Sequence, residues 1–181
     1  MSPGSLLIAD PSVIGDNNFH RSIILLVEHD HNGSFGFIIN NPLNYTTNDI
    51  TIEMEYDFPL YYGGPVDQEN LFFVHKMGNL IPNSVQIQND LYWGGDFKKT
   101  ISLVNNKQLN VNDIKFFLGY SGWSPNQLNS EIESKSWIVK KNSNSSEIFR
   151  NKSKSLWSKK MKELGGDFIL WSNSPENPYE N

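Results

Sequence analysis

Residues 115–128 constrain the fold more than any other stretch of this chain. Residues 116–120, Phe-Phe-Leu-Gly-Tyr, form a short aromatic run of the kind that fills a buried strand. Gly119 and Gly122 bracket what we expect to be a tight exit, because a missing Cβ permits a positive φ or a close approach of two backbones. The stretch therefore predicts a buried strand that turns sharply at its end.

A helix is predicted directly after this bend. Ser124 is a favourable N-cap, and Pro125 suits the first helical position, where its missing N–H costs nothing. Gln127 comes three residues after the cap, so its side chain can return to the Ser124 backbone and complete a capping box. Leu128 and Ile132 give the helix an apolar face that packs inward.

The clearest strand signal lies in two apolar runs, 22–28 and 34–40. The residues between them end in Asn32-Gly33, a pair typical of tight hairpin turns. Both runs are apolar at successive positions, which predicts a hairpin that is covered on both faces. Further strands are expected at 5–9, 60–62, 70–75, 84–88, 91–93 and 137–139, and further helices at 96–104 and 156–164.

This order of elements predicts an α+β fold. Strands and helices do not alternate regularly, so we expect a single domain with a largely antiparallel or mixed β-sheet and a few packed helices. The length of 181 residues suffices for one well-buried domain and is short for two. The domain is expected to span residues 1–165, and residues 166–181 are expected to be a loosely ordered tail.

Composition narrows the class of protein. The chain has no cysteine, which excludes disulfides, thiolate metal sites and thiol chemistry. It has no run of about 18 apolar residues, so no membrane span is expected. The first five residues carry no basic side chain, which argues against a secretory signal. We therefore expect a cytoplasmic protein.

The net charge of −5 is unevenly distributed. Residues 1–139 hold 15 acidic and 7 basic side chains, whereas residues 140–164 hold 8 basic and 2 acidic ones. This balance disfavours nucleic acid over most of the surface. The basic segment 150–162 is the exception, and because its lysines spread around a helix, a solvated helix face is its favoured interpretation.

Several spaced motifs carry a family resemblance. They are Phe19–Ile23, Glu28-His29, Gly36–Leu43, Gly63–Val66, Val74-His75, Gly119–Trp123, Gln127-Leu128 and Glu131. Together they resemble the YqgE/AlgH family of bacterial proteins over roughly residues 5–165. The resemblance implies a single α+β domain in a bacterial, cytosolic protein, and it implies no established biochemical activity. Members often carry the label of transcriptional regulator.

Three kinds of reactive site are disfavoured by the residues themselves. Ser121 lacks the Gly-x-Ser-x-Gly pattern of a nucleophile elbow, because position 123 is tryptophan. The four histidines include no i, i+4 pair that suggests a metal site, so no metal is expected. The Gly63-Gly64-Pro65 sequence lacks the lysine of a phosphate loop, and its proline removes an N–H donor.

The remaining polar candidates could line a cleft between the Gly63 and Gly122 bends. The candidate ligand-binding residues are Arg21, His29, His75, Gln127 and Glu131, each of which also has a structural interpretation. The glycine-rich motifs are expected to be structural, with the residues Gly63, Gly64, Pro65, Gly119, Gly122 and Trp123.

The sequence favours a cytosolic binding or regulatory module that acts through protein contacts. Its abundant aromatic residues suit an interaction surface, and no catalytic constellation or cofactor motif is visible. One alternative is a small-ligand binder or enzyme that uses the cleft near Gly63 and Gly122. A second alternative is a transcriptional regulator that binds DNA through the basic segment 150–162.

Overall fold

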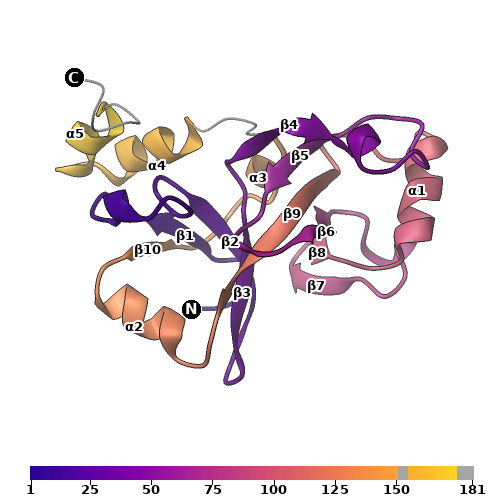
Figure 1. Ribbon diagram of the computed structural model, residues 1–181. Coiled ribbons are helices and arrows are strands. Elements are labelled where there is room, and N and C mark those ends of the chain that lie inside the picture. The colour runs from indigo at the N-terminus through magenta and orange to yellow at the C-terminus, as the bar shows by residue number, and fades with distance from the viewer. Residues whose placement is uncertain (151–154, 175–181) are drawn as a thin grey trace.

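The computed structural model describes residues 1–150 and 155–174. In this part of the chain, ten strands and five α-helices form the predicted α+β fold (Figure 1). The strands are β1 Leu6–Ala9, β2 Ile23–Asp30, β3 Gly33–Ile38, β4 Pro42–Thr46, β5 Pro59–Tyr62, β6 Val66–His75, β7 Val85–Gln88, β8 Leu91–Trp93, β9 Ile114–Trp123 and β10 Trp137–Lys140. The α-helices are α1 Phe97–Asn105, α2 Gln127–Glu133, α3 Ser146–Arg150, α4 Leu156–Leu164 and α5 Phe168–Ser172. Short 3-10 helices cover Val13–Gly15, Thr47–Asp49 and Gly78–Leu80.

The sheet is largely antiparallel, which agrees with the prediction of a largely antiparallel or mixed sheet. Its strand order is β10-β1-β2-β3-β9-β6-β8-β7, and the described pairings along this path are antiparallel. β4 pairs with β5, and β5 runs parallel to β9. The predicted hairpin is confirmed, because β2 and β3 pair from Ile24 opposite Ile38 to Asp30 opposite Gly33.

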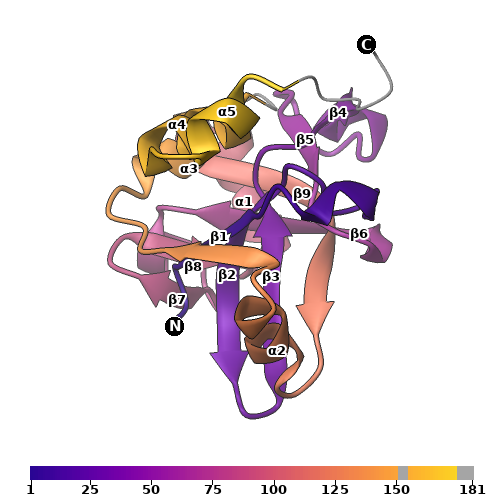
Figure 2. The same ribbon diagram turned by 90° about the vertical axis from the view of Figure 1, so that its left-hand side faces the viewer.

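Helices cover both faces of the sheet. One face packs against α3 and α4 through Phe149 and Trp157. The other face packs against α2 near β1, β2 and β3, and against α1 near β6 and β9. Figure 2 shows α3, α4 and α5 gathered at one end of the molecule and α2 at the other, beside the tip of the β2–β3 hairpin. Cover on both faces explains why successive positions of β2 are apolar.

The Gly63-Gly64-Pro65 motif carries the chain across β9. β5 pairs with β9 on one edge and β6 pairs with it on the other, so the three residues between them must cross that strand. A Cβ on Gly63 would lie 2.1 Å from the Gly119 carbonyl oxygen, and a Cβ on Gly64 would lie 2.3 Å from the Tyr120 carbonyl carbon. Glycine is required here because two backbones touch.

Gly119 reorients β9 without ending it. The strand runs from Ile114 to Trp123, so the sharp exit that we predicted at Gly119 and Gly122 is wrong. Gly119 has φ +69°, a conformation that glycine adopts without a steric penalty. Phe117 and Tyr120 are three residues apart and yet pack in the same cluster, whereas strict alternation would place them on opposite faces. The glycine therefore turns Tyr120 toward the face that carries Phe117.

Helix α2 begins later than the sequence predicts. Ser124 and Pro125 form a turn in which the Ser124 carbonyl accepts a bond from Gln127 N at 3.0 Å. Asn126 follows with φ +63°, a left-handed conformation that cannot belong to an α-helix. The predicted return contact is nevertheless present, because Gln127 Oε1 accepts a bond from Ser124 N at 3.0 Å.

The segment 166–181 also differs from the prediction of a loosely ordered tail. Helix α5 forms within it, and Phe168 packs against the cluster that contains Trp157. Residues 175–181 lie outside the described part of the chain.

Candidate functional site

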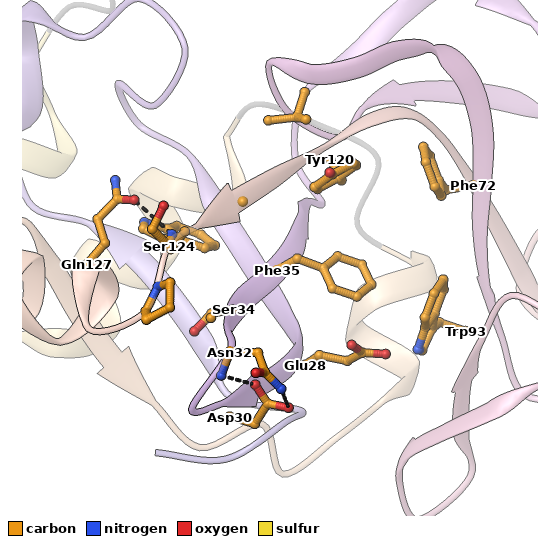
Figure 3. A pocket seen from close by; sticks show the side chains of 15 residues that line it. Glu28, Asp30, Asn32, Ser34, Phe35, Phe72, Trp93, Tyr120, Ser124 and Gln127 are labelled. Carbon is orange, nitrogen blue, oxygen red and sulfur yellow. Dashed lines mark hydrogen bonds between the residues drawn. The ribbon is translucent and has the colours of Figure 1, made fainter.

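An open groove of about 740 Å³ lies at the tip of the β2–β3 hairpin (Figure 3). The hairpin forms one side, the end of β9 and the turn before α2 form the floor and far end, and side chains of β6 and β8 form the other side. Its lining residues are Glu28, Asp30, Asn32, Gly33, Ser34, Phe35, Val66, Phe72, Trp93, Tyr120, Gly122, Trp123, Ser124, Pro125 and Gln127. Segments that are distant in sequence therefore build this site together.

The hairpin tip is held in place by local contacts. Asp30 Oδ1 accepts a bond from Asn32 N at 2.7 Å, and this backbone bond lowers the pKa of the Asp30 carboxyl. Gly33 has φ +140°, and a Cβ there would lie 2.5 Å from the Trp123 carbonyl oxygen. The tip therefore packs directly on the end of β9.

Four half-buried aromatic rings line one wall of the groove. Phe35 contacts Trp93 edge-on, with centroids 4.9 Å apart, and Tyr120 edge-on at 5.6 Å. Tyr120 contacts Phe72 at 5.7 Å with an interplanar angle of 77°. Edge-to-face pairs of this kind are favourable and fix the ring positions. The groove wall is therefore preformed by contacts among its own side chains.

Among the described residues that line the groove, the charged side chains are all acidic. Glu28 stands opposite Phe35 across the hairpin, and Asp30 follows on the same strand face. No described lining residue is lysine, arginine or histidine. Trp93 Nε1 is buried and has no hydrogen-bond acceptor in the described structure. Figure 3 shows the Glu28 carboxylate extending toward the Trp93 ring.

The floor of the groove includes a strand segment that is paired on one edge. Residues 121–123 of β9 pair with β3, from Gly36 opposite Ser121 to Ser34 opposite Trp123. On the opposite edge, the described pairing with β6 extends only to Tyr120, which faces Val66. The end of β9 is therefore a strand edge that adjoins the groove.

Two of the predicted ligand-binding residues, Gln127 and Glu131, contact each other, and Glu131 itself does not line the groove. Gln127 lines it, and its Nε2 donates to Glu131 Oε1 at 3.0 Å. Glu131 Oε2 accepts bonds from the indole nitrogens of Trp123 and Trp137, each at 2.8 Å. These bonds give Glu131 a structural role, and ligand binding by either residue stays a prediction.

The other candidates do not join this site, so the expected convergence on one cleft is wrong. Arg21 Nη2 donates to Ser174 O and Oγ, each at 2.7 Å, and its guanidinium lies 4.9 Å from the Trp157 ring centre. His29 Nδ1 lies 2.7 Å from Ser34 Oγ. Gly63 does not line the groove, although Gly122 does. The strand crossing places Gly63 against Gly119 instead.

His75 is fully buried in a network of its own. Its Nδ1 accepts a bond from Met77 N at 3.1 Å, and its Nε2 lies 3.1 Å from the Gly94 carbonyl and 3.0 Å from Ser84 Oγ. Burial lowers the pKa of His75 to about 4, against a weaker opposite effect of the Gly94 bond. A second proton on Nδ1 would face the Met77 N–H, which also opposes ionisation.

We therefore expect His75 to make stability depend on pH. Its pKa in the folded state lies below the ordinary value of 6.5, so the unfolded chain binds more protons between these values. The stabilisation is complete above about pH 6.5 and is lost as pH falls toward 4, by on the order of 2 kcal/mol. Urea unfolding from pH 7 to 4 should show a smaller loss for His75→Gln than for the native chain or for His31→Gln. Equal pH slopes for the native chain and His75→Gln would contradict this.

Ser121, which lacks the sequence pattern of a nucleophile elbow, is buried and has a structural contact. Its Oγ donates to the Gly63 carbonyl at 3.1 Å, and this bond ties β9 to the crossing segment.

The basic segment 150–162 lies only partly in the described structure. In its described part, Lys160 Nζ contacts Glu147 at 2.6 Å and Glu163 at 3.0 Å, and Lys159 contacts Glu147 at 3.2 Å. These acids offset the positive charge of the helix face. Residues 151–154, which carry two of the lysines, are outside the described residues.

The described residues contain neither a cluster of metal ligands nor a membrane-spanning helix. No group of three or more histidine, aspartate or glutamate side chains comes together there in an arrangement that would hold a metal ion. No helix within the described ranges has the length and apolar character needed to cross a membrane.

Sequence reasoning missed the aromatic wall, namely Phe35, Phe72, Trp93 and Tyr120. These residues lie on β3, β6, β8 and β9, and each belongs to a run that a buried strand also explains. Glu28 entered the sequence analysis only within an apolar run and as part of the family motif Glu28-His29. No local pattern marks these five residues as neighbours, because strand pairing alone brings them together.

The fold and groove define a single-domain α+β protein with a largely antiparallel sheet. A family model described as AlgH-like matches residues 6–169, and the chain belongs to this family. The resemblance to the YqgE/AlgH family is therefore confirmed.

Relatives match along nearly the whole length. A UPF0301 protein of Cytophaga hutchinsonii is 39% identical over all of both chains, and one of Parabacteroides distasonis is 39% identical over 98% of this chain and 90% of its own. Their names state no activity or ligand.

Two solved structures share the fold. The crystal structure of a Corynebacterium diphtheriae protein has a TM-score of 0.77 at 22% identity, covering 96% of this chain and 93% of its own. The solution structure of the AlgH protein of Pseudomonas aeruginosa has a TM-score of 0.74 at 21% identity, covering 96% and 94%. At these identities the similarity establishes the fold alone.

Proposed function

We propose that this protein is a cytoplasmic binding module that takes an extended segment of a partner protein into the aromatic groove. The observation that carries the proposal is the combination of a preformed aromatic wall with an adjoining strand edge. A strand edge can add a peptide by backbone hydrogen bonds, and pockets beside it can select alternate side chains. Aromatic residues are also enriched where proteins bind one another.

The polar groups near the groove favour binding over chemistry. Glu131 and Gln127 are engaged with tryptophans, with each other and with a backbone amide. No described lining residue is a histidine, lysine or arginine that would serve as a general acid or base beside the two carboxylates. This supports a recognition surface more than an enzyme, and a regulatory role would follow from the partner that it binds.

A selection from random octapeptides tests the proposal. Peptides enriched on the native protein should bind Trp93→Ala at least tenfold more weakly, because that change removes one ring of the wall. Tyr45→Ala should bind like the native protein, since Tyr45 is 57% exposed on β4 and does not line the groove. Thermal unfolding of both variants checks that they are folded.

The same peptides should perturb the backbone amide signals of residues 121–124 in a ¹H–¹⁵N NMR titration. Failure to enrich any peptide, or binding that Trp93→Ala leaves unchanged, would overturn the proposed function.

A further inference from the structure

The aromatic wall and the two acids of the groove form a site with the chemistry of a cation receptor. Phe35, Trp93 and Tyr120 present ring surfaces that are only half buried, and Glu28 and Asp30 lie on the same side of the hairpin. Cations bind over aromatic faces, with tryptophan the strongest partner, and the attraction increases when water is partly excluded. A carboxylate beside such a ring adds a charge-assisted hydrogen bond.

We infer that the segment bound in this groove presents an arginine, whose guanidinium lies against the Trp93–Phe35 wall and pairs with Glu28. This inference rests on the proposed function and names the side chain that the groove selects. Its three supports are the acidic lining, the absence of basic side chains among the described lining residues, and the exposed ring surfaces.

Arginine fits these surroundings better than lysine. The guanidinium is planar, so it stacks on a ring while its edge forms two parallel bonds to one carboxylate. Glu28 projects from the strand position opposite Phe35, which places its carboxylate at the side of the aromatic wall and not behind it. Asp30, which is exposed near the hairpin tip and lines the groove, adds a second negative charge beside Glu28 at neutral pH.

The charge on the rest of the chain is consistent with a basic partner. The chain carries a net charge of −5, and the exposed start of β6 beside the groove contributes Asp67 and Glu69. Attraction between exposed charges is screened by salt over about 10 Å at 0.1 M ionic strength. Binding of a basic segment should therefore weaken as salt rises.

The test uses two synthetic pentapeptides with blocked ends, Thr-Val-Arg-Val-Thr and the same peptide with citrulline in place of arginine. Citrulline keeps the shape and most hydrogen-bonding capacity but removes the positive charge. The Trp93 indole N–H signal of ¹⁵N-labelled protein reports binding. We expect at least fivefold tighter binding of the arginine peptide at 50 mM NaCl, and a clear loss of that preference at 500 mM.

Two variants that remove the same charge distinguish a contact between arginine and Glu28 from attraction by the net negative charge of the protein. Glu28→Gln should reduce the preference for arginine to less than twofold while leaving citrulline-peptide binding unchanged. Glu55→Gln removes the same charge outside the groove and should keep the full preference.

Equal affinities of the native protein for both peptides would overturn the arginine site and leave the proposed peptide binding intact. A preference that survives Glu28→Gln would also overturn it. If neither pentapeptide shifts the Trp93 signal although octapeptides are selected, arginine recognition is overturned. If no octapeptide is selected either, the proposed function is overturned together with arginine recognition.

Discussion

Replacing Lys115 by alanine is expected to lower the free energy of unfolding by about 3–5 kcal/mol, although this lysine touches no part of the groove. Lys115 is only 4% exposed, and its Nζ donates to the Ile39 carbonyl at 2.7 Å and to the Ile148 carbonyl at 3.1 Å. The ammonium also lies 3.7 Å from the centre of the Tyr61 ring. One cation thus joins the end of β3, helix α3 and β5.

The size of this effect follows from what the substitution leaves behind. Alanine would leave a cavity between the sheet and α3, and both carbonyls would lose a charged donor in a place that water does not reach. The Tyr61 phenol is neutral at pH 7, and burial raises its pKa further, to about 12; its ring face is the cation–π partner of the ammonium.

Urea unfolding of two further variants separates packing from charge. Lys115→Met keeps most of the volume and should lose about half as much stability as Lys115→Ala. Lys98→Met is the control, because Lys98 is exposed on α1 and its loss should change stability by less than about 0.5 kcal/mol. If Lys115→Met were as stable as the native chain, the two carbonyl bonds and the ring contact would contribute nothing net.

Replacing Glu131 by alanine is expected to cost about 3 kcal/mol of stability. Glu131 Oε2 is the acceptor for the indole N–H groups of Trp123 and Trp137, which are 6% and 5% exposed. Without this carboxylate two buried donors lose their acceptor, at about 1–3 kcal/mol each. The rings of the two tryptophans contact each other edge-on at 6.1 Å, so they would lose their fixed arrangement together.

The matched variants for this prediction are Glu131→Gln and Glu133→Ala. Glutamine retains one carbonyl oxygen and should lose only about 1 kcal/mol, because an acceptor remains. Glu133 is exposed on the same helix, and its replacement should change stability by less than about 0.5 kcal/mol. Guanidinium unfolding followed by tryptophan fluorescence measures all three. A loss below 1 kcal/mol for Glu131→Ala would contradict the role of Glu131 as the shared acceptor.

The elements with local signals were predictable. Asn32-Gly33 between apolar runs indicates a hairpin, and the hairpin is present. A helix was expected at 96–104, and the Asp96 side chain accepts a bond from Lys99 N at 2.9 Å at the start of α1. Each of these signals depends on residues within a few positions of one another, where steric and hydrogen-bonding rules apply directly.

The sequence predicts that glycine is required in these motifs, but it does not predict which contacts the glycines make. A requirement for glycine at 63, 64 and 119 is visible in the sequence, because only close backbone contact or a positive φ demands it. The sequence does not show that Gly63 lies against Gly119, or that Gly119 rotates a continuous strand. Both facts depend on the β5–β9–β6 crossing, which joins residues more than 50 positions apart.

The sequence by itself determined the class of fold, the hairpin and the start of α1 at Asp96, because these follow from periodicity and from contacts between near neighbours. Only the tertiary structure decided where the groove lies. Phe35, Phe72, Trp93 and Tyr120 come from four strands, and their meeting depends on strand order and on a register that one glycine shifts. The dependence on strand order and register also explains why Arg21, His29 and His75 lie in separate places. In the sequence, all three were candidates for the same cleft. Pairing between distant strands, and not local composition, sets which side chains share a surface.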